Sequence, residues 1–208
     1  MKRAFTCASA AALLIAAAGL AQEKPNYSID GARSKVEINV YKEGLFKAFG
    51  HDHVIAAKEL SGQVQFDAEK IDQSTVRLKL PTKSITVIDP GESEKDRRDV
   101  QATMEGEKVL DVARFPEITF SSSHVSAVKR TQDGWELTLS GNLSLHGVKK
   151  PVSFPLRVHV EAAELYGEGD FSILQTDYGI TPVKVGGGTV KVKDKLKISF
   201  IVVAQKQN

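Results

Sequence analysis

Apolar and polar residues alternate along most of the chain. In "KVEINVY" (residues 35–41), Val36, Ile38 and Val40 fall on one face of an extended chain, and the polar residues fall on the other. The same period of two recurs in "SGQVQFD" (61–67), "TVRLKLPT" (75–82), "EITFSSSHV" (117–125), "WELTLSGNLSL" (135–145), "VSFPLRVHV" (152–160), "YGEGDFSI" (166–173) and "TVKVKDKLKISFIVV" (189–203). Such alternation indicates strands with one buried and one solvated face, as in antiparallel sheets. About eight such strands in one domain predict a sandwich or a closed barrel.

One region departs from this pattern. The charged segment "ESEKDRRDVQATMEGEKVLDVARFPE" (92–117) has no alternation and spaces Val100, Met104 and Leu110 in a roughly helical manner. We expect one or two short helices between Glu94 and Val112, ending before Pro116. Tight hairpin turns with positive φ are predicted at Asp133-Gly134 and His146-Gly147. No feature of the sequence indicates a repeat or a second domain.

The first residues have the pattern of a secretory signal peptide. A basic start at Lys2 and Arg3 precedes an uncharged apolar run from Ala8 to Leu20, and small residues follow. The run is shorter than the ~20 apolar residues that a membrane-spanning helix needs, although a retained anchor is the weaker alternative. We expect residues 1–21 to be a cleaved signal peptide and residues 22–208 to form one mature domain, periplasmic or secreted, without a transmembrane segment.

Charge and cysteine content exclude several classes of function. Without Lys2 and Arg3 the basic residues fall from 28 to 26, which equals the 26 acidic residues. A net charge near zero gives no reason to expect a nucleic-acid partner. The only cysteine, Cys7, lies in the expected signal peptide. The mature chain is therefore predicted to have no disulfide and no redox-active thiol.

Three segments together resemble the YceI-like family of bacterial periplasmic proteins. They are "LSGQVQFD" (Leu60–Asp67), the charged insert with "RFPEITF" (Glu94–Ser122), and "LSGNLSLHGVKKPVSFPL" (Leu139–Leu156). The resemblance implies an all-β fold: an antiparallel, lipocalin-like β-barrel of about eight strands with a short helical insert. It also implies a hydrophobic tunnel that holds a long isoprenoid or other amphiphilic lipid. Here "YKEGLFKAFGHDHVIA" (41–56) replaces the usual family pattern after the first strand, and we expect it near the barrel mouth.

The candidate ligand-binding residues follow from this expectation. They are inward-facing apolar residues and the histidines of the "GHDH" segment: Phe46, Phe49, His51, His53, Val64, Phe66, Leu78, Phe120, Trp135, Phe154, Phe171 and Phe200. For each aromatic residue alone, ordinary core packing is the simpler interpretation. Only as a set around a cavity would they form the wall of a binding site.

His51 and His53 also raise the alternative of a metal site. On a strand the two imidazoles project to the same face, with Asp52 on the other. A zinc or copper site would need a third ligand, for which His124, His146 and His159 are the other histidines. Contact with a ligand head group at a polar barrel mouth, or a purely structural role with Asp52 bonding backbone amides, are the remaining interpretations.

Catalysis finds little support, and no catalytic residue is assigned. The mature chain has no cysteine nucleophile and no Gly-x-Ser-x-Gly elbow, and "VGGGTV" (185–190) lacks the ending of a phosphate-binding loop. The favoured hypothesis is a non-enzymatic periplasmic carrier with no cofactor other than its lipid. The alternatives are a metal-binding or redox-associated protein using His51 and His53, and a ligand-free structural module whose aromatic residues leave no tunnel. The sequence does not decide whether two barrels pair as a homodimer.

Overall fold

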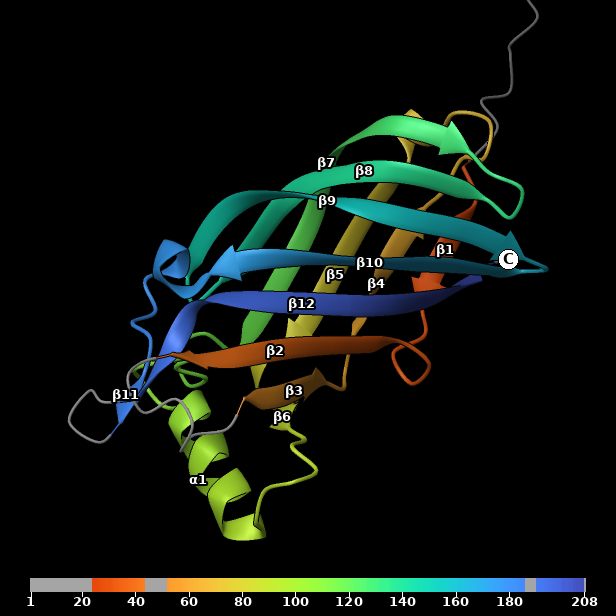
Figure 1. Ribbon diagram of the computed structural model, residues 1–208. Helices are drawn as coiled ribbons and strands as arrows, with labels where there is room; N and C mark the ends of the chain where they lie inside the picture. The colour runs from red at the N-terminus through yellow and green to blue at the C-terminus, as the bar shows by residue number, and fades with distance from the viewer. Residues whose placement is uncertain (1–23, 44–51, 186–189, 208) are drawn as a thin grey trace, which may run out of the picture.

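The computed structural model describes residues 24–43, 52–185 and 190–207, which form a closed antiparallel β-barrel with one α-helix (Figure 1). The strands are β1 (Asn26–Ile29), β2 (Lys35–Glu43), β3 (His53–Ala57), β4 (Ser61–Gln65), β5 (Thr75–Pro81), β6 (Ile85–Val87), β7 (Glu117–Arg130), β8 (Trp135–Leu145), β9 (Val148–Glu161), β10 (Glu164–Leu174), β11 (Lys184–Val185) and β12 (Val190–Lys206), and the helix is α1 (Glu94–Glu105). The predicted all-β barrel with a short helical insert is confirmed. No helix of the described residues is long and apolar enough to cross a membrane.

The barrel is a ring of eight strand positions. The order is β1–β4–β5–β7–β8–β9–β10–β12, and β12 pairs back with β1. The strands β2, β3 and β6 continue the ring beyond β1, β4 and β5, because β2 pairs with β12, β3 with β2, and β6 with β3. Three neighbouring positions of the ring are therefore each occupied by two strands in line: β1 with β2, β4 with β3, and β5 with β6.

Side chains replace missing backbone partners at the first of these interruptions and at a bulge in β7. Between β1 and β2, the Ser34 hydroxyl accepts from the backbone N–H of Val203 at 3.0 Å and donates to the carbonyl of Asp30 at 2.7 Å. At the bulge in β7, the hydroxyl of Ser122 accepts from the backbone N–H of Val76 at 2.8 Å. Buried backbone groups without a partner are costly, so these polar residues make the interruptions tolerable.

Helix α1 covers the free edge of β6. Strand β7 begins only at Glu117, so β6 has no neighbour from β7. The Gln101 side-chain amide fills that place: it donates to the Ile85 carbonyl at 2.9 Å and accepts from the Val87 N–H at 2.9 Å. Ser93 caps the helix by accepting from the Asp96 N–H at 3.1 Å. The insert thus holds one helix, and turns follow it as far as Pro116.

Replacing Gln101 with alanine is expected to destabilise this edge of the barrel. Two backbone groups lose their partners, which should lower the free energy of unfolding by about 1–3 kcal/mol. Urea unfolding measures that loss, and hydrogen exchange should show faster exchange at the Val87 amide. Arg98→Ala is the control, because Arg98 lies on the same helix and makes only an exposed pair with Glu94. Equal losses in the two variants would contradict the role assigned to Gln101.

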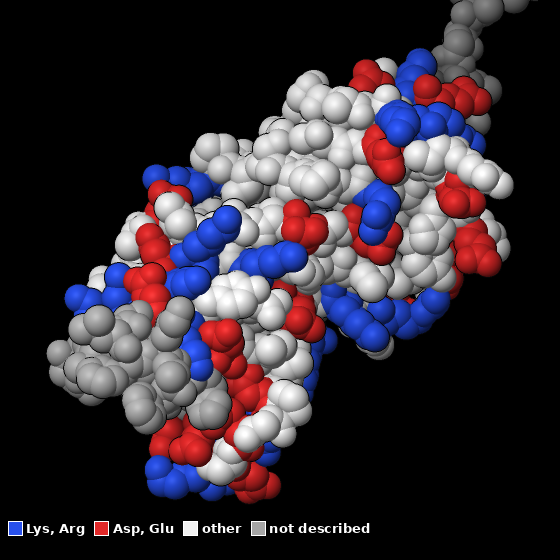
Figure 2. Space-filling model, viewed as in Figure 1, with Lys and Arg blue, Asp and Glu red and all other residues white. Residues whose placement is uncertain are grey.

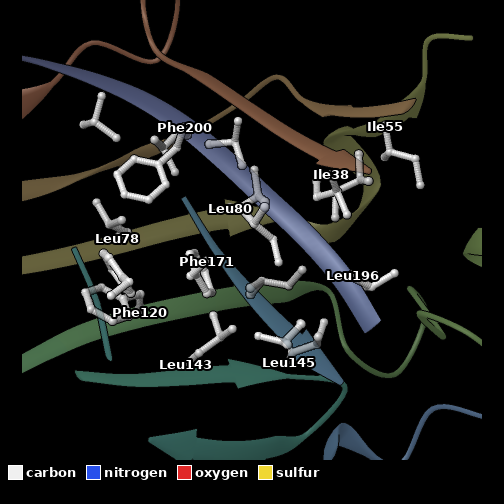
Figure 3. Close-up of a pocket in the computed structure, with 18 of the residues that line it drawn as sticks. Ile38, Ile55, Leu78, Leu80, Phe120, Leu143, Leu145, Phe171, Leu196 and Phe200 are labelled. Carbon is white, nitrogen blue, oxygen red and sulfur yellow. The ribbon is translucent and has the colours of Figure 1, made fainter. Parts of the chain in front are cut away.

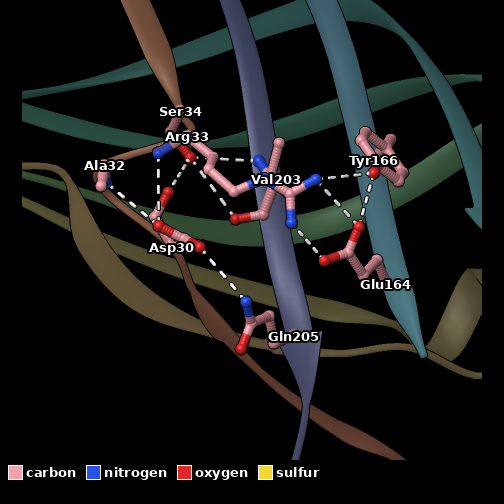
Figure 4. Close-up of polar contacts among 8 residues, drawn as sticks. All are labelled: Asp30, Ala32, Arg33, Ser34, Glu164, Tyr166, Val203 and Gln205. Atoms are coloured by element: carbon pink, nitrogen blue, oxygen red, sulfur yellow. Dashed lines mark hydrogen bonds and ion pairs between the residues drawn. The ribbon is translucent and has the colours of Figure 1, made fainter.

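A polar network fastens the opposite end of the barrel. Arg33, in the turn between β1 and β2, reaches across β12 to form an ion pair with Glu164 and to donate to the Tyr166 hydroxyl at 3.0 Å (Figure 4). The hydrogen bond from Arg33, followed by that from Tyr166, lowers the pKa of the Glu164 carboxyl below its ordinary value. The contact therefore stabilises the fold above the ordinary carboxyl pKa and weakens as the pH falls.

Aromatic side chains fill the interior at this same end. The Phe66 ring packs against Trp135 with 5.3 Å between centroids and against Tyr27 with 6.5 Å. All three residues are buried. Side chains therefore fill the end of the barrel that Arg33 bridges.

The turn predictions hold with one correction. His146 and Gly147, between β8 and β9, have φ of 51° and 74°, as predicted. Gly134 also lies in a turn, but it is not among the residues with positive φ. Glycine is needed there because a Cβ would lie 2.1 Å from the carbonyl oxygen of Val158. Close approach of the backbone, not backbone handedness, explains this residue.

Charges are dispersed over the visible surface. Figure 2 shows basic and acidic side chains interspersed on the face in view, with an uncharged area over β8 and β9. The outward residues of these strands include Thr138, Ser140 and Pro155.

Candidate functional site

The barrel encloses an apolar cavity of about 600 Å³, which we call the tunnel. Figure 3 shows side chains from many strands converging on it, including Ile38 of β2, Leu78 of β5, Leu143 of β8 and Phe200 of β12. These are the inward members of the alternating rows. The volume lies within the ~300–1,000 Å³ typical of small-molecule sites. This open volume contradicts the expectation, attached to the alternative of a structural module, that aromatic residues leave no tunnel.

Aromatic rings form one part of the tunnel wall. Phe154 stacks on Phe171 with 4.7 Å between ring centroids, and it contacts Phe200 edge-on at 5.6 Å. Phe120 lies 5.7 Å from Phe154 on the other side. Phe171 and Phe200 are only partly buried because one side of each ring faces the tunnel. The rings support one another and still leave open volume.

Most of the described candidate residues line the tunnel. These are His53, Val64, Phe66, Leu78, Phe120, Phe154, Phe171 and Phe200. Trp135 does not line it: the indole is packed against Phe66 in the filled end, with the Arg130 guanidinium 4.2 Å from its centroid. The assignment of Trp135 to the wall is therefore wrong. Phe46, Phe49 and His51 lie outside the described residues.

The opposite end of the tunnel, which we call the mouth, is bordered by the end of β2, the start of β3 and α1. His53 stands in the inward row of β3, and its Nδ1 lies 2.6 Å from Asp89 Oδ2. Asp89, only 4% exposed, also accepts from the backbone N–H of Val54. The backbone N–H of Lys42 donates to Asp52 Oδ1 at 2.9 Å. Asp52 therefore bonds a backbone amide, and His53 is oriented by a buried carboxylate.

The metal interpretation finds no third ligand in the described part of the chain. No three His, Cys, Asp or Glu residues described by the structure are grouped to hold a metal ion. His146 lies 3.1 Å from the Tyr178 carbonyl through Nδ1, and His159 stacks on Tyr166 with 4.5 Å between centroids. Both are engaged elsewhere in the fold, away from His53.

Lys42 at the mouth, and Asp89 and Gln101 beside it, were not predicted from the sequence. Lys42 continues the inward row of Val36, Ile38 and Val40, so the alternation itself could have identified it. Asp89 and Gln101 carried no such signal, because their partners lie far away in the sequence.

Comparison with known proteins agrees with this architecture. A model of the YceI-like domain family matches residues 27–204. Protein YceI of Salmonella newport (strain SL254) is 30% identical over 148 residues, which cover 67% of each chain. The chain spans about half to two thirds of the length of the curated relatives it matches.

Two solved structures share the fold. BcnA of Burkholderia cenocepacia superposes with a TM-score of 0.66 at 24% identity, covering 85% of this chain and 99% of BcnA. A polyisoprenoid binding domain from Saccharophagus degradans, implicated in plant cell wall breakdown, gives 0.62 at 14% identity, covering 87% of this chain and 98% of that domain. With the match of its sequence from residue 27 to residue 204, the chain belongs to the YceI-like domain family.

Proposed function

We propose that this protein is a periplasmic binding or carrier protein that holds the tail of an isoprenoid or other amphiphilic lipid in the tunnel. The observation that carries the proposal is the apolar cavity of about 600 Å³ inside the closed barrel. Each methylene group moved from water into such a cavity contributes ~0.8 kcal/mol. A long apolar tail thus provides most of the affinity.

The two ends of the tunnel give the ligand a direction. Rings of Tyr27, Phe66 and Trp135 fill one end, whereas polar side chains, His53 among them, border the mouth. A tail pointing toward the rings leaves the head group at the mouth, where it can form hydrogen bonds. The shared fold with a polyisoprenoid binding domain supports a ligand of this class.

A carrier in the periplasm accounts for the remaining features. Residues 1–21 have the composition of a signal peptide, which supports export. The tunnel wall is built from aliphatic and aromatic side chains that bind by burial, and no catalytic role is assigned to any of them. We therefore propose binding and transport of a lipid, without chemical conversion of it.

Extraction of lipid from the exported protein tests the proposal. The full chain is expressed in a bacterial host, and the mature protein is purified from the periplasm without detergent. Native mass spectrometry should then show a bound apolar mass, and organic extraction should recover a prenyl or acyl lipid. Purified protein without lipid should bind prenyl alcohols more tightly as the chain grows from ten to twenty carbons. Lipid-free protein whose affinity does not depend on chain length would overturn the proposal.

A further inference from the structure

We infer that the mouth selects an amphiphile with an anionic head group, a phosphate or a carboxylate, and that Lys42 recognises it. The inference rests on the proposed function, because a tail held in the tunnel brings the head group to the mouth. It goes further by assigning the chemical class of that head group.

Lys42 faces into the barrel at the mouth. The inward row of β2 runs through Val36, Ile38 and Val40 and reaches Lys42 next, and all four residues line the tunnel. The pairing of β2 with β12 agrees, because Lys42 lies opposite Val192, another lining residue. The Lys42 ammonium group lies at the end of this apolar row, so it can contact the head group of a lipid whose tail packs against the row.

The residues on either side of Lys42 contact lysines of β12. The Glu43 carboxylate forms an ion pair with Lys191 at 2.6 Å, and the ring of Tyr41 lies 5.8 Å from the Lys193 Nζ. Tyr41 and Lys191 also line the cavity, so orientation alone does not set Lys42 apart. The charge of Lys191 is already paired with Glu43, whereas Lys42 has no such partner among the described residues.

Acidic side chains near the mouth already have other partners. Asp89 accepts from His53 and from the Val54 N–H, and Asp99 forms an ion pair with Lys95 at 2.8 Å. Asp52 accepts from the backbone N–H of Lys42. Within the described parts of the chain, no carboxylate lies at ion-pair distance from the Lys42 ammonium. A bound anion would supply the missing negative charge.

His53 offers the head group a second contact. It lies opposite Val40 on β3, so it is diagonal to Lys42 across the strand pair. Diagonal neighbours are separated by ~7–8 Å, a gap that a phosphate or carboxylate can bridge. Asp89 contacts Nδ1 of the ring, and among the described residues no hydrogen bond to Nε2 is formed. Nε2 can form a hydrogen bond with the head group, whereas a neutral alcohol would leave the Lys42 charge uncompensated.

Matched pairs of amphiphiles test the inference. The ligands are geranylgeranyl monophosphate against geranylgeraniol, and hexadecanoate against hexadecanol, each below its micelle concentration. Purified, delipidated protein should bind each anion about 10- to 100-fold more tightly than its alcohol, as measured by displacement of a fluorescent probe. Comparing the two anions shows whether phosphate or carboxylate is preferred.

Three lysine variants assign the effect to Lys42. Lys42→Met keeps the apolar stem and should bring each anion to within about threefold of its alcohol. Lys42→Arg should retain the preference. Lys195→Met is the charge-matched control, because Lys195 is exposed on the outer row of β12. It should leave the preference intact.

The outcomes separate this inference from the proposed function. If the wild-type protein binds anions and alcohols equally, the inference is wrong while the tunnel remains a lipid site. The inference is also wrong if Lys42→Met still prefers anions over alcohols, or if Lys195→Met loses that preference as fully as Lys42→Met does. If neither the anions nor the alcohols nor the parent hydrocarbons bind, the proposed function fails as well.

Discussion

Replacing Gly62 with alanine is expected to cost the barrel about 3 kcal/mol or more of its free energy of unfolding. Gly62 lies in β4 with φ of +145°, a conformation that side chains rarely adopt. A Cβ at this position would lie 2.0 Å from the Arg77 carbonyl oxygen and 3.0 Å from the Leu78 Cα, both in the backbone of β5. Since β4 and β5 are paired through this point, neither strand can move away without breaking the ladder. The loss is large against a typical total stability of ~5–15 kcal/mol.

Gly91 provides the matched control for this substitution. It lies between β6 and α1, and a Cβ there would meet no atom within 4 Å. Gly91→Ala should therefore change the free energy of unfolding by no more than about 0.5 kcal/mol. Urea unfolding of the wild-type protein and both variants, followed by circular dichroism, gives the comparison. A similar small change in both variants would show that β4 can adapt and that this strand is less constrained than its pairing indicates.

The sequence predicted the longer strands, but not the short strands β1, β3 and β6 or the places where the strands are interrupted. A period of two is visible in a single segment, so residues 135–145 and 152–160 could be assigned directly. The interruption at Asp30–Ser34 depends on Ser34 meeting Val203, a partner 169 residues away. Gly62 and Gly91 illustrate the same limit, because the requirement for glycine at Gly62 comes from Arg77 and Leu78 across the ladder.

The residues that face the tunnel could be predicted from the sequence, but the open volume between them could not. Alternation identifies the residues that face inward, and it placed Leu78, Phe120 and Phe200 correctly on that side. Whether an interior is hollow depends on the diameter of the barrel, which follows from strand tilt and stagger and not from any one strand. Trp135 was misplaced for this reason: it is inward-facing, but it lies at the filled end beside Phe66.

Some residues at the mouth could be predicted from the local sequence, whereas others depend on contacts between distant segments. Lys42 could be found by extending the row of β2 by two residues. The His53–Asp89 pair joins residues 36 positions apart, and it forms only because Ile88 and Asp89 run on beside Val54 after β6. Of the "GHDH" segment the structure describes Asp52 and His53, and the partner of His53 is a buried carboxylate that the segment itself does not reveal.

Replacing Leu78 with arginine is expected to weaken binding of a long-chain amphiphile about 100-fold or more. Leu78 is an inward residue of β5, lies opposite Phe120 and is only partly buried because it faces the tunnel. The cavity of about 600 Å³ has room for the longer side chain, so the barrel should still fold without ligand. A bound tail would bury the guanidinium against hydrocarbon, which costs several kcal/mol. Every 1.4 kcal/mol of that cost lowers the affinity ~10-fold.

Two further variants separate a charge in the tunnel from other effects of the mutation. Leu78→Met keeps the volume and apolar character of the site and should bind the amphiphile within about threefold of wild type. Thr75→Arg adds the same charge on the exposed face of the same strand and should leave binding unchanged. Titration of delipidated protein with a fluorescent fatty acid measures all three. If Leu78→Arg bound as tightly as Thr75→Arg, the tail would have to lie outside the barrel. The inward rows would then be an ordinary core around unused space, so this comparison decides whether the cavity is the binding site.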